Sequence, residues 1–161
     1  MSSVRILGIG SPSGDDQAGW LTIDALEAAG VHANRERIIE KLDRPGAQLI
    51  SLLENADWVI LVDAMQGGGE PGRIQRFDQN AWSDYRHGLS SHGLGVLDAL
   101  SLARELGTLP PRIDLYGIEI GSAAPGDQAG TGIQAAAQQL ARRLAAELTA
   151  ATRRAGRAPA H

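Results

Sequence analysis

Two neighbouring carboxylates stand in a loop whose other residues are typical of a phosphate-binding turn. The stretch "GIGSPSGDDQAGW" follows an apolar segment, precedes a segment with helical periodicity, and holds Asp15 and Asp16. A helix N-terminus attracts phosphate, but carboxylates at the same place repel it. The loop therefore predicts a close backbone approach to a cationic group rather than to a phosphate.

Two further polar residues are expected at the same edge of the molecule. Asp63 follows the uniformly apolar run 58–62, and His92 stands in "SSHGLG" just before a helix-like segment. In open α/β sheets, ligand sites form beyond the carboxyl ends of the strands. Asp16, Asp63 and His92 form a nitrogen and oxygen ligand set that suits a borderline divalent metal such as nickel or zinc. We predict that these three residues form a metal site.

Each of these residues also has a structural interpretation. For Asp15 the sequence favours a helix N-cap over a metal ligand. Taken alone, Asp16 fits a solvated acid in a first helical turn, Asp63 fits a helix cap, and His92 fits a hydrogen-bonded loop histidine. Two features favour ligation: a charge at the end of a buried strand needs a partner, and a helix N-terminus disfavours a protonated imidazole. The other histidines, which we expect at the surface, are His32, His87 and His161.

The elements that must position these residues follow a parallel α/β pattern, because apolar segments of strand length alternate with amphipathic segments of helix length. We expect strands at 4–10, 37–43, 57–64 and 110–120, with a weaker edge or antiparallel strand at 73–77. We expect helices at 17–29, 46–56 and 94–107, and a last helix from 131. The predicted fold is an α/β three-layer sandwich, with a twisted, mostly parallel sheet of about five strands and helices on both faces.

The sequence also predicts where two of the helices begin or end and how far the domain extends. The final helix should begin with a capping box formed by Thr131 and Gln134, and Gly107 should end the helix before it. We expect residues 1–152 to form one domain and residues 153–161 to form a frayed tail.

Helical spacing predicts which side chains face the core. The predicted core positions are Leu21, Ala25 and Ala28 in the first helix, Leu49, Leu52 and Leu53 in the second, Leu97, Leu100, Ala103 and Leu106 in the third, and Ile133, Ala137, Leu140, Leu144 and Leu148 in the last.

Composition excludes several classes of protein. The chain has 161 residues, a formal net charge of −4 with scattered Lys and Arg, and no cysteine. We therefore expect no nucleic-acid partner, no membrane partner, no thiolate metal site and no cysteine nucleophile. No signal peptide or spanning helix is recognisable, which predicts a cytoplasmic protein, and no self-association heptad is present, which predicts a monomer.

Competing catalytic motifs do not fit. A dinucleotide fingerprint needs glycines at its first, third and sixth positions, but after Gly8 and Gly10 the next glycine, Gly14, comes one place late. Neither "GSPSG" nor "GLSSHG" has the spacing of a serine-hydrolase nucleophile elbow, and no HExxH occurs. A nucleotide-binding domain is thus disfavoured, although calorimetry with nucleotides would reveal one.

Four segments together resemble the maturation endopeptidases of nickel-iron hydrogenases. They are "ILGIGSPSGDDQAG", "VILVDA", "SSHGLGVLDALSLARELG" and "LYGIEI", and the similarity runs from about Val4 to Leu148. In that family an acidic residue in the first loop, an aspartate ending a central strand and a histidine before a helix bind a metal. The resemblance places these roles on Asp16, Asp63 and His92, and it implies that the same three residues are the catalytic groups.

The resemblance implies a specific activity. The family removes a short C-terminal extension from the hydrogenase large-subunit precursor once nickel has been inserted, and nickel in the precursor is the recognition signal. The implied partner is thus the nickel-loaded precursor, and the implied metal is nickel carried by that substrate, with cadmium or zinc as substitutes in vitro. A rival remains open, a nickel-binding chaperone or sensor of the same fold without peptidase activity, because no dedicated nucleophile is visible.

The chain departs from the family pattern at several places. Ser11 stands where the family usually has asparagine, in a shorter loop, and Gln17 and Ile120 replace a frequent glycine and a proline. The segment "KLDRPGAQL" occupies the place of a glycine-rich family segment, where Gly46 fits a plain turn better than a contact with the precursor. These differences concern the choice of target more than the reaction.

Overall fold

The computed structural model describes residues 3–78, 81–82, 95–121 and 129–156. Along the chain, the elements are strand β1 (Val4–Gly10), a 3-10 turn η1 (Gly14–Gln17), helix α1 (Ala18–Ala28), β2 (Arg37–Asp43), α2 (Gln48–Leu53), β3 (Trp58–Met65), β4 (Ile74–Phe77), α3 (Val96–Leu106), β5 (Arg112–Glu119) and α4 (Thr131–Gly156). No described helix is both long and apolar enough to cross a membrane.

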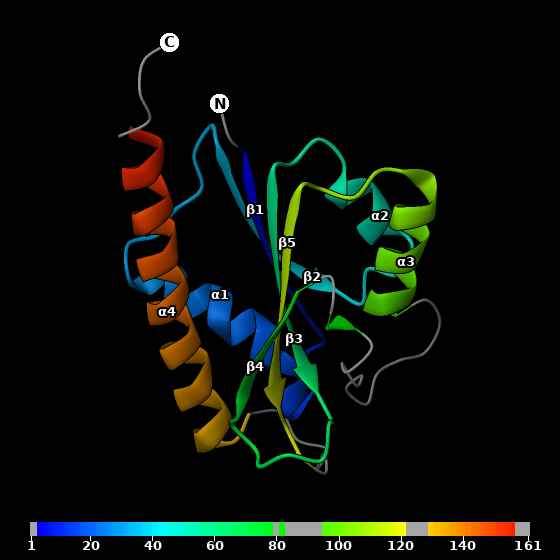
Figure 1. Ribbon diagram of the computed structural model, residues 1–161. Coiled ribbons are helices and arrows are strands. Elements are labelled where there is room, and N and C mark those ends of the chain that lie inside the picture. Colours follow the sequence, from blue (N-terminus) through cyan, green and yellow to red (C-terminus); the bar gives the residue numbers. More distant parts are fainter. Residues whose placement is uncertain (1–2, 79–80, 83–94, 122–128, 157–161) are drawn as a thin grey trace.

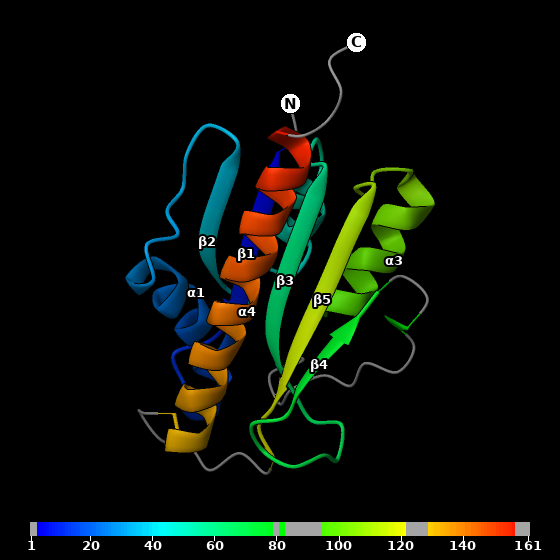
Figure 2. The same ribbon diagram turned by 60° about the vertical axis from the view of Figure 1, so that its left-hand side comes forward.

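The strands form one five-stranded sheet in the order β2-β1-β3-β5-β4. The first four are parallel, and β4 pairs antiparallel with β5 at the edge of the sheet, with Gln75 opposite Gly117. Helices α1 and α4 cover one face, whereas α2 and α3 cover the other (Figures 1 and 2). The predicted fold class is therefore confirmed, together with the antiparallel edge strand.

The central strand, β3, explains where the core lies. Side chains of β3 alternate between the faces, so that Ile60 and Val62 pack with α1 and α4 while Val59 and Leu61 pack with α2 and α3. Both sets are buried, as expected for a parallel strand covered on both faces. This burial is what the uniformly apolar run in the sequence indicated.

Helix α1 approaches the sheet closely because glycines meet at the contact. A Cβ atom on Gly8 would lie 2.5 Å from the Gly19 carbonyl oxygen, and one on Gly19 would clash with the carbonyl oxygens of Ile9 and Val62. The absence of side chains at both positions therefore lets the backbone of α1 rest on β1 and β3. This contact fixes the start of α1, and with it the loop that carries the two aspartates.

The predicted core faces are correct for α4 and partly wrong for α1 and α3. All five predicted core residues of α4 are buried. In α1, the buried positions include Ile23 and Leu26, whereas Ala28 is exposed, because the glycine contact turns the helix to a different face. In α3, Leu106 is 59% exposed and Val96 and Ala99 are buried instead. A spacing of three residues falls short of the 3.6-residue turn, so that such a pattern drifts around the helix by roughly 60° at each step.

One predicted helix end is confirmed, and another needs correction. Gly107 does end α3 in a left-handed conformation, with a φ of 72°. The capping box at Thr131 is wrong, because Thr131 is already helical and the Gln134 side chain donates to the Ala129 carbonyl at 2.8 Å. Helix α4 continues to Gly156, past the position where the tail was expected to begin.

Candidate metal-binding site at the carboxyl edge of the sheet

Asp16 is held at the end of β1 by a compact loop. Its backbone N–H donates to the Ser13 carbonyl at 3.0 Å, and its own carbonyl accepts from the Ser11 N–H at 3.3 Å. The buried Ser11 hydroxyl also donates to Asp16 Oδ2 at 3.1 Å. Gly10 has no room for a side chain, because a Cβ atom there would lie 2.5 Å from the Asp16 carbonyl oxygen. The position of the Asp16 carboxylate is thus fixed by contacts within the loop.

The neighbouring Asp15 is turned toward a different part of the molecule. Its Oδ1 accepts a hydrogen bond of 2.8 Å from the backbone N–H of Gly130, directly before α4. No side-chain cap is present on η1 or α1. Asp15 therefore has the kind of structural role that the sequence favoured, but it serves the start of α4 rather than the helix that follows it.

Asp63 lies on the central strand β3, next to β1. The strand continues for two residues beyond it, to Met65, so that Asp63 does not end the strand as the sequence indicated. Its side chain is half-buried, and Oδ1 accepts from the Ala64 N–H at 2.9 Å. On β5 the residue in register with it is Gly117.

The two predicted carboxylates lie at one edge of the sheet, Asp63 on β3 and Asp16 in the turn that follows the neighbouring strand β1. The last paired residues of β1 and β3 are Gly8 and Val62, so that Asp63 lies one residue beyond that pair. The turn η1, which carries Asp16, is itself in contact with β3. Both carboxylates are half-buried, so that a ligand can approach them from solvent.

The third predicted ligand, His92, lies outside the described residues, as does His87. Within the described residues, no three side chains of the His, Asp and Glu type are grouped closely enough to hold a metal ion. Helix α3, which His92 precedes, packs on the same face as α2. In α3, the Asp98 carboxylate accepts from the Gly95 N–H at 3.2 Å and so stabilises the helix start.

The structure adds a cationic residue near Asp16 that sequence reasoning missed. Arg44 follows β2 with a φ of 44°, and its backbone N–H donates to the Gly10 carbonyl at 3.1 Å. Its Nε donates to Asp43 Oδ1 at 2.7 Å. The hydrogen bond to Asp43 and the charge of Asp43 raise the pKa of the Arg44 guanidinium, and the more distant charge of Asp16 adds to this effect. Arg44 follows β2, whose carboxyl end adjoins that of β1, so the sequence could have predicted its place near Asp16. The sequence could not have predicted its left-handed backbone conformation.

A buried carboxylate at the end of β5 was also missed. Glu119 is 1% exposed, and its two oxygens accept from the Gly67 N–H at 3.0 and 3.1 Å. A Cβ atom on Gly67 would lie 2.6 Å from Glu119 Oε1, so the glycine-rich loop after β3 folds over this carboxylate. The sequence did contain a signal for this buried carboxylate, because Glu119 stands inside the apolar run "LYGIEI".

The chain thus has a doubly covered, mostly parallel α/β sheet with two carboxylates at its carboxyl edge, which is the edge where α/β proteins of this architecture bind ligands. A family model described as hydrogenase maturation protease matches residues 44–150. The chain belongs to the hydrogenase maturation protease family.

Solved structures of maturation proteases share the fold. The hydrogenase maturating endopeptidase HybD from E. coli superposes with a TM-score of 0.79 at 23% identity, covering 92% of this chain and 93% of that one. The [NiFe] hydrogenase maturation protease HycI from Thermococcus kodakarensis has a TM-score of 0.67 at 25% identity, with the same coverage. The hydrogenase 2 maturation peptidase from a Thaumarchaeota archaeon has a TM-score of 0.66 at 21% identity, covering 92% and 99%. A search of curated proteins found no match.

Proposed function

We propose that this protein is an endopeptidase that removes the C-terminal extension of a nickel-loaded [NiFe] hydrogenase large-subunit precursor. Membership of the maturation protease family supports the peptidase class. The observation that carries the proposal is that Asp63 on β3 and Asp16 in the turn η1, which follows the neighbouring strand β1 and contacts β3, lie at one edge of the sheet. Nickel enters the site as part of the substrate, and it serves as the recognition element.

The chemistry of the donor groups fits such a cation. Carboxylate oxygens, together with the imidazole nitrogen of His92, are ligands that nickel accepts. Asp16 and Asp63 are half-buried, so that their charges are partly shielded from water and remain within reach of a docked precursor. The same arrangement explains why no phosphate-binding function is expected, since two carboxylates repel an anion at this edge.

Within the proposed reaction, the residues of this chain hold and orient the precursor. Asp16, Asp63 and His92 bind the precursor's nickel and bring the scissile peptide to the edge of the sheet. The ion polarises the scissile carbonyl or lowers the pKa of the attacking water. One of the carboxylates accepts the proton of that water, and the proton then passes to the leaving amine.

The proposal is tested by incubating the protein with a nickel-loaded precursor and recording the intact mass of the large subunit. We expect the mass to fall by that of one C-terminal peptide. Replacement of either carboxylate, Asp16→Asn or Asp63→Asn, should lower the cleavage rate by about 100-fold or more, because ligation and proton transfer both depend on the charge. The Tm of each variant should stay close to that of the wild type.

Two other aspartates provide matched controls. Asp15→Asn removes a charge next to Asp16 but keeps an oxygen that can accept from Gly130. Asp24→Asn breaks an exposed ion pair with Lys41. Both variants should cleave at nearly the wild-type rate. A precursor mass that stays unchanged with the wild-type protein would contradict the proposal and favour the nickel-binding chaperone or sensor.

A further inference from the structure

A cationic groove lies at the amino edge of the sheet, opposite to the edge with Asp16 and Asp63. Its volume is about 430 Å³. Because β1, β2, β3 and β5 are parallel, their first residues meet at this edge, and the last turns of α4 close one side. The groove is therefore built by elements that the sheet holds in fixed positions.

Three guanidinium groups line the groove, with a single carboxylate among the lining residues. They belong to Arg37, Arg112 and Arg154, and the carboxylate belongs to Glu36. This local excess of positive charge stands against a formal net charge of −4 for the whole chain. Clefts lined by one sign of charge concentrate ligands of the opposite sign.

Arg112 is preorganised by a buried network. Its Nε donates to Asp114 Oδ2 at 3.1 Å, and its guanidinium carbon lies 3.9 Å from the centroid of the Trp58 ring. Asp114 is 1% exposed and also accepts from Trp58 Nε1 at 2.9 Å and from Arg76 at 2.6 Å. These contacts fix the plane of the Arg112 guanidinium. Its terminal NH2 groups make no hydrogen bond to any described residue, and a fixed pair of this kind matches an oxyanion.

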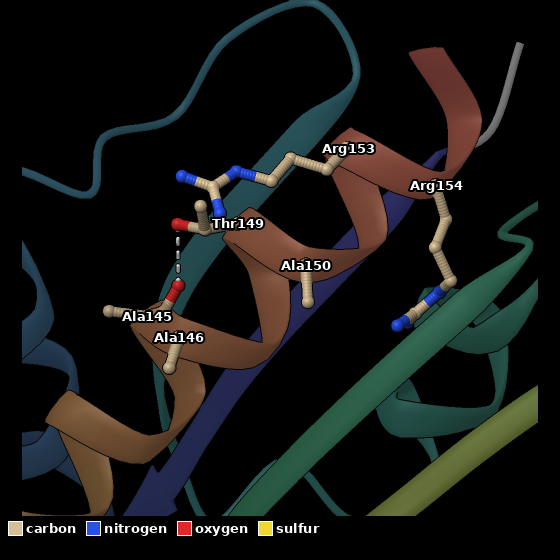
Figure 3. Close-up of a pocket in the computed structure, with 6 residues that line it drawn as sticks. All are labelled: Ala145, Ala146, Thr149, Ala150, Arg153 and Arg154. Carbon is tan, nitrogen blue, oxygen red and sulfur yellow. Dashed lines mark hydrogen bonds between the residues drawn. The ribbon is translucent and has the colours of Figure 1, made fainter. Parts of the chain in front are cut away.

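The other two arginines are also available to a ligand. Arg37 makes one long contact of 3.5 Å with the His32 carbonyl, which is at the limit of a hydrogen bond. Arg154 makes no hydrogen bond or ion pair with the part of the chain that the structure describes. Figure 3 shows the side chains of Arg153 and Arg154 leaving α4 in different directions. Both arginines line a hollow on the surface of α4, but only Arg154 also lines the groove.

We propose that this groove binds a small molecule that carries oxyanion groups, either phosphates or carboxylates. Three guanidiniums supply charge-assisted hydrogen bonds, and the Trp58 ring lies beneath the Arg112 guanidinium in the lining of the groove. The volume lies within the range of small-molecule pockets, which is roughly 300–1,000 Å³. The site is separate from the carboxyl edge, so that this proposal does not depend on the peptidase activity.

The test measures binding of two probes, pyrophosphate and citrate, to the full chain by calorimetry at low ionic strength. We expect saturable binding of at least one probe, together with a shift of the Trp58 indole N–H signal in nuclear magnetic resonance spectra. Arg154→Gln should weaken that binding by about fivefold or more, as expected for the loss of one charge-assisted contact. A preference for pyrophosphate would identify a phosphate ligand, and a preference for citrate a carboxylate ligand.

Arg153→Gln is the matched control, because it removes the same charge from the adjacent position of α4 without changing the groove. The affinity of Arg153→Gln for the probe should stay within about twofold of that of the wild type, as expected for the loss of an exposed charge outside the site. Three results would overturn the proposal: no saturable binding of either probe, an unchanged affinity in Arg154→Gln, or an equal loss in both variants.

Discussion

Two adjacent aspartates with the same side chain have different positions and different expected roles. Asp15 reaches Gly130, which is 115 positions away along the chain, whereas Asp16 stays with Ser11 inside its own loop. The sequence distinguished the two by expecting a cap at Asp15 and a ligand at Asp16. It could not name the partner of Asp15, because that contact depends on where α4 begins relative to β1. Local patterns predict the type of a residue's role better than its distant partner.

At the same scale, the expected part of His92 in metal binding leads to a pH prediction. Imidazole protonation competes with metal binding, so that affinity for free cadmium or nickel should fall as the pH drops below about 6.5. The wild-type protein should therefore bind more weakly at pH 5.5 than at pH 7.5, as measured by calorimetry. His92→Ala should bind weakly at both values. An affinity that stays constant between pH 5 and pH 8 would remove His92 from the ligand set.

At the scale of elements, the contact of α1 with the sheet depends on glycine. In Gly19→Ala, the new Cβ would meet backbone oxygens on two strands, which cannot move independently of the sheet. We expect the free energy of unfolding to fall by about 2 kcal/mol or more, despite the better helix propensity of alanine. Urea unfolding measures this change.

Gly132→Ala provides the control for that substitution. Gly132 also lies in a helix, but a Cβ there would meet no atom within 4 Å. The free energy of unfolding of Gly132→Ala should be unchanged or higher by up to about 1 kcal/mol. Equal destabilisation of both variants would contradict the role assigned to the close contact between α1 and the sheet.

A second contact between elements couples β5 to α4. The buried Tyr116 hydroxyl donates to the Glu147 carboxylate, with distances of 3.3 and 3.0 Å to its two oxygens. Burial raises the pKa of the Tyr116 phenol, and the charge of Glu147 and this hydrogen bond raise it further. A raised pKa in the folded state means that the stabilisation is complete below the unfolded value of about 10 and is lost as the pH rises above it.

This sign predicts the behaviour of Tyr116→Phe in alkaline solution. Between pH 9 and 11, the free energy of unfolding of the wild type should fall more steeply than that of the variant. The extra slope from one group is at most about 1.4 kcal/mol per pH unit. Parallel curves from urea unfolding at each pH would show that the folded and unfolded proteins titrate this phenol alike.

The elements show which parts of the fold could be predicted from the sequence. Strand positions agree within a few residues, because apolar runs such as that of β3 reflect burial on both faces of the sheet. The core face of α4 was also predictable, since its apolar residues recur at spacings of three and four. The face of α1 was not, because close contact of two glycines turned the helix, and a glycine has no hydropathy signal that marks such a contact.

At the scale of the whole molecule, the parallel sheet separates two kinds of charge. Asp16 and Asp63 lie at the carboxyl edge of the sheet, whereas the groove with three arginines lies at the amino edge. The rule that sites lie beyond the carboxyl ends predicted the first feature from sequence. The groove could be found only in the three-dimensional structure, because Arg37, Arg112 and Arg154 lie far apart in the sequence and share no motif.

Recognition of the precursor through its nickel is tested most directly by comparing two samples of one hydrogenase large-subunit precursor, one nickel-loaded and one nickel-free. Both are incubated with the wild-type protein, and release of the C-terminal peptide is followed over time by mass spectrometry. If carboxylates at the carboxyl edge recognise the precursor through its nickel, the loaded sample should be cut at least about tenfold faster, a difference of about 1.4 kcal/mol. Equal cleavage rates for the two samples would contradict nickel recognition.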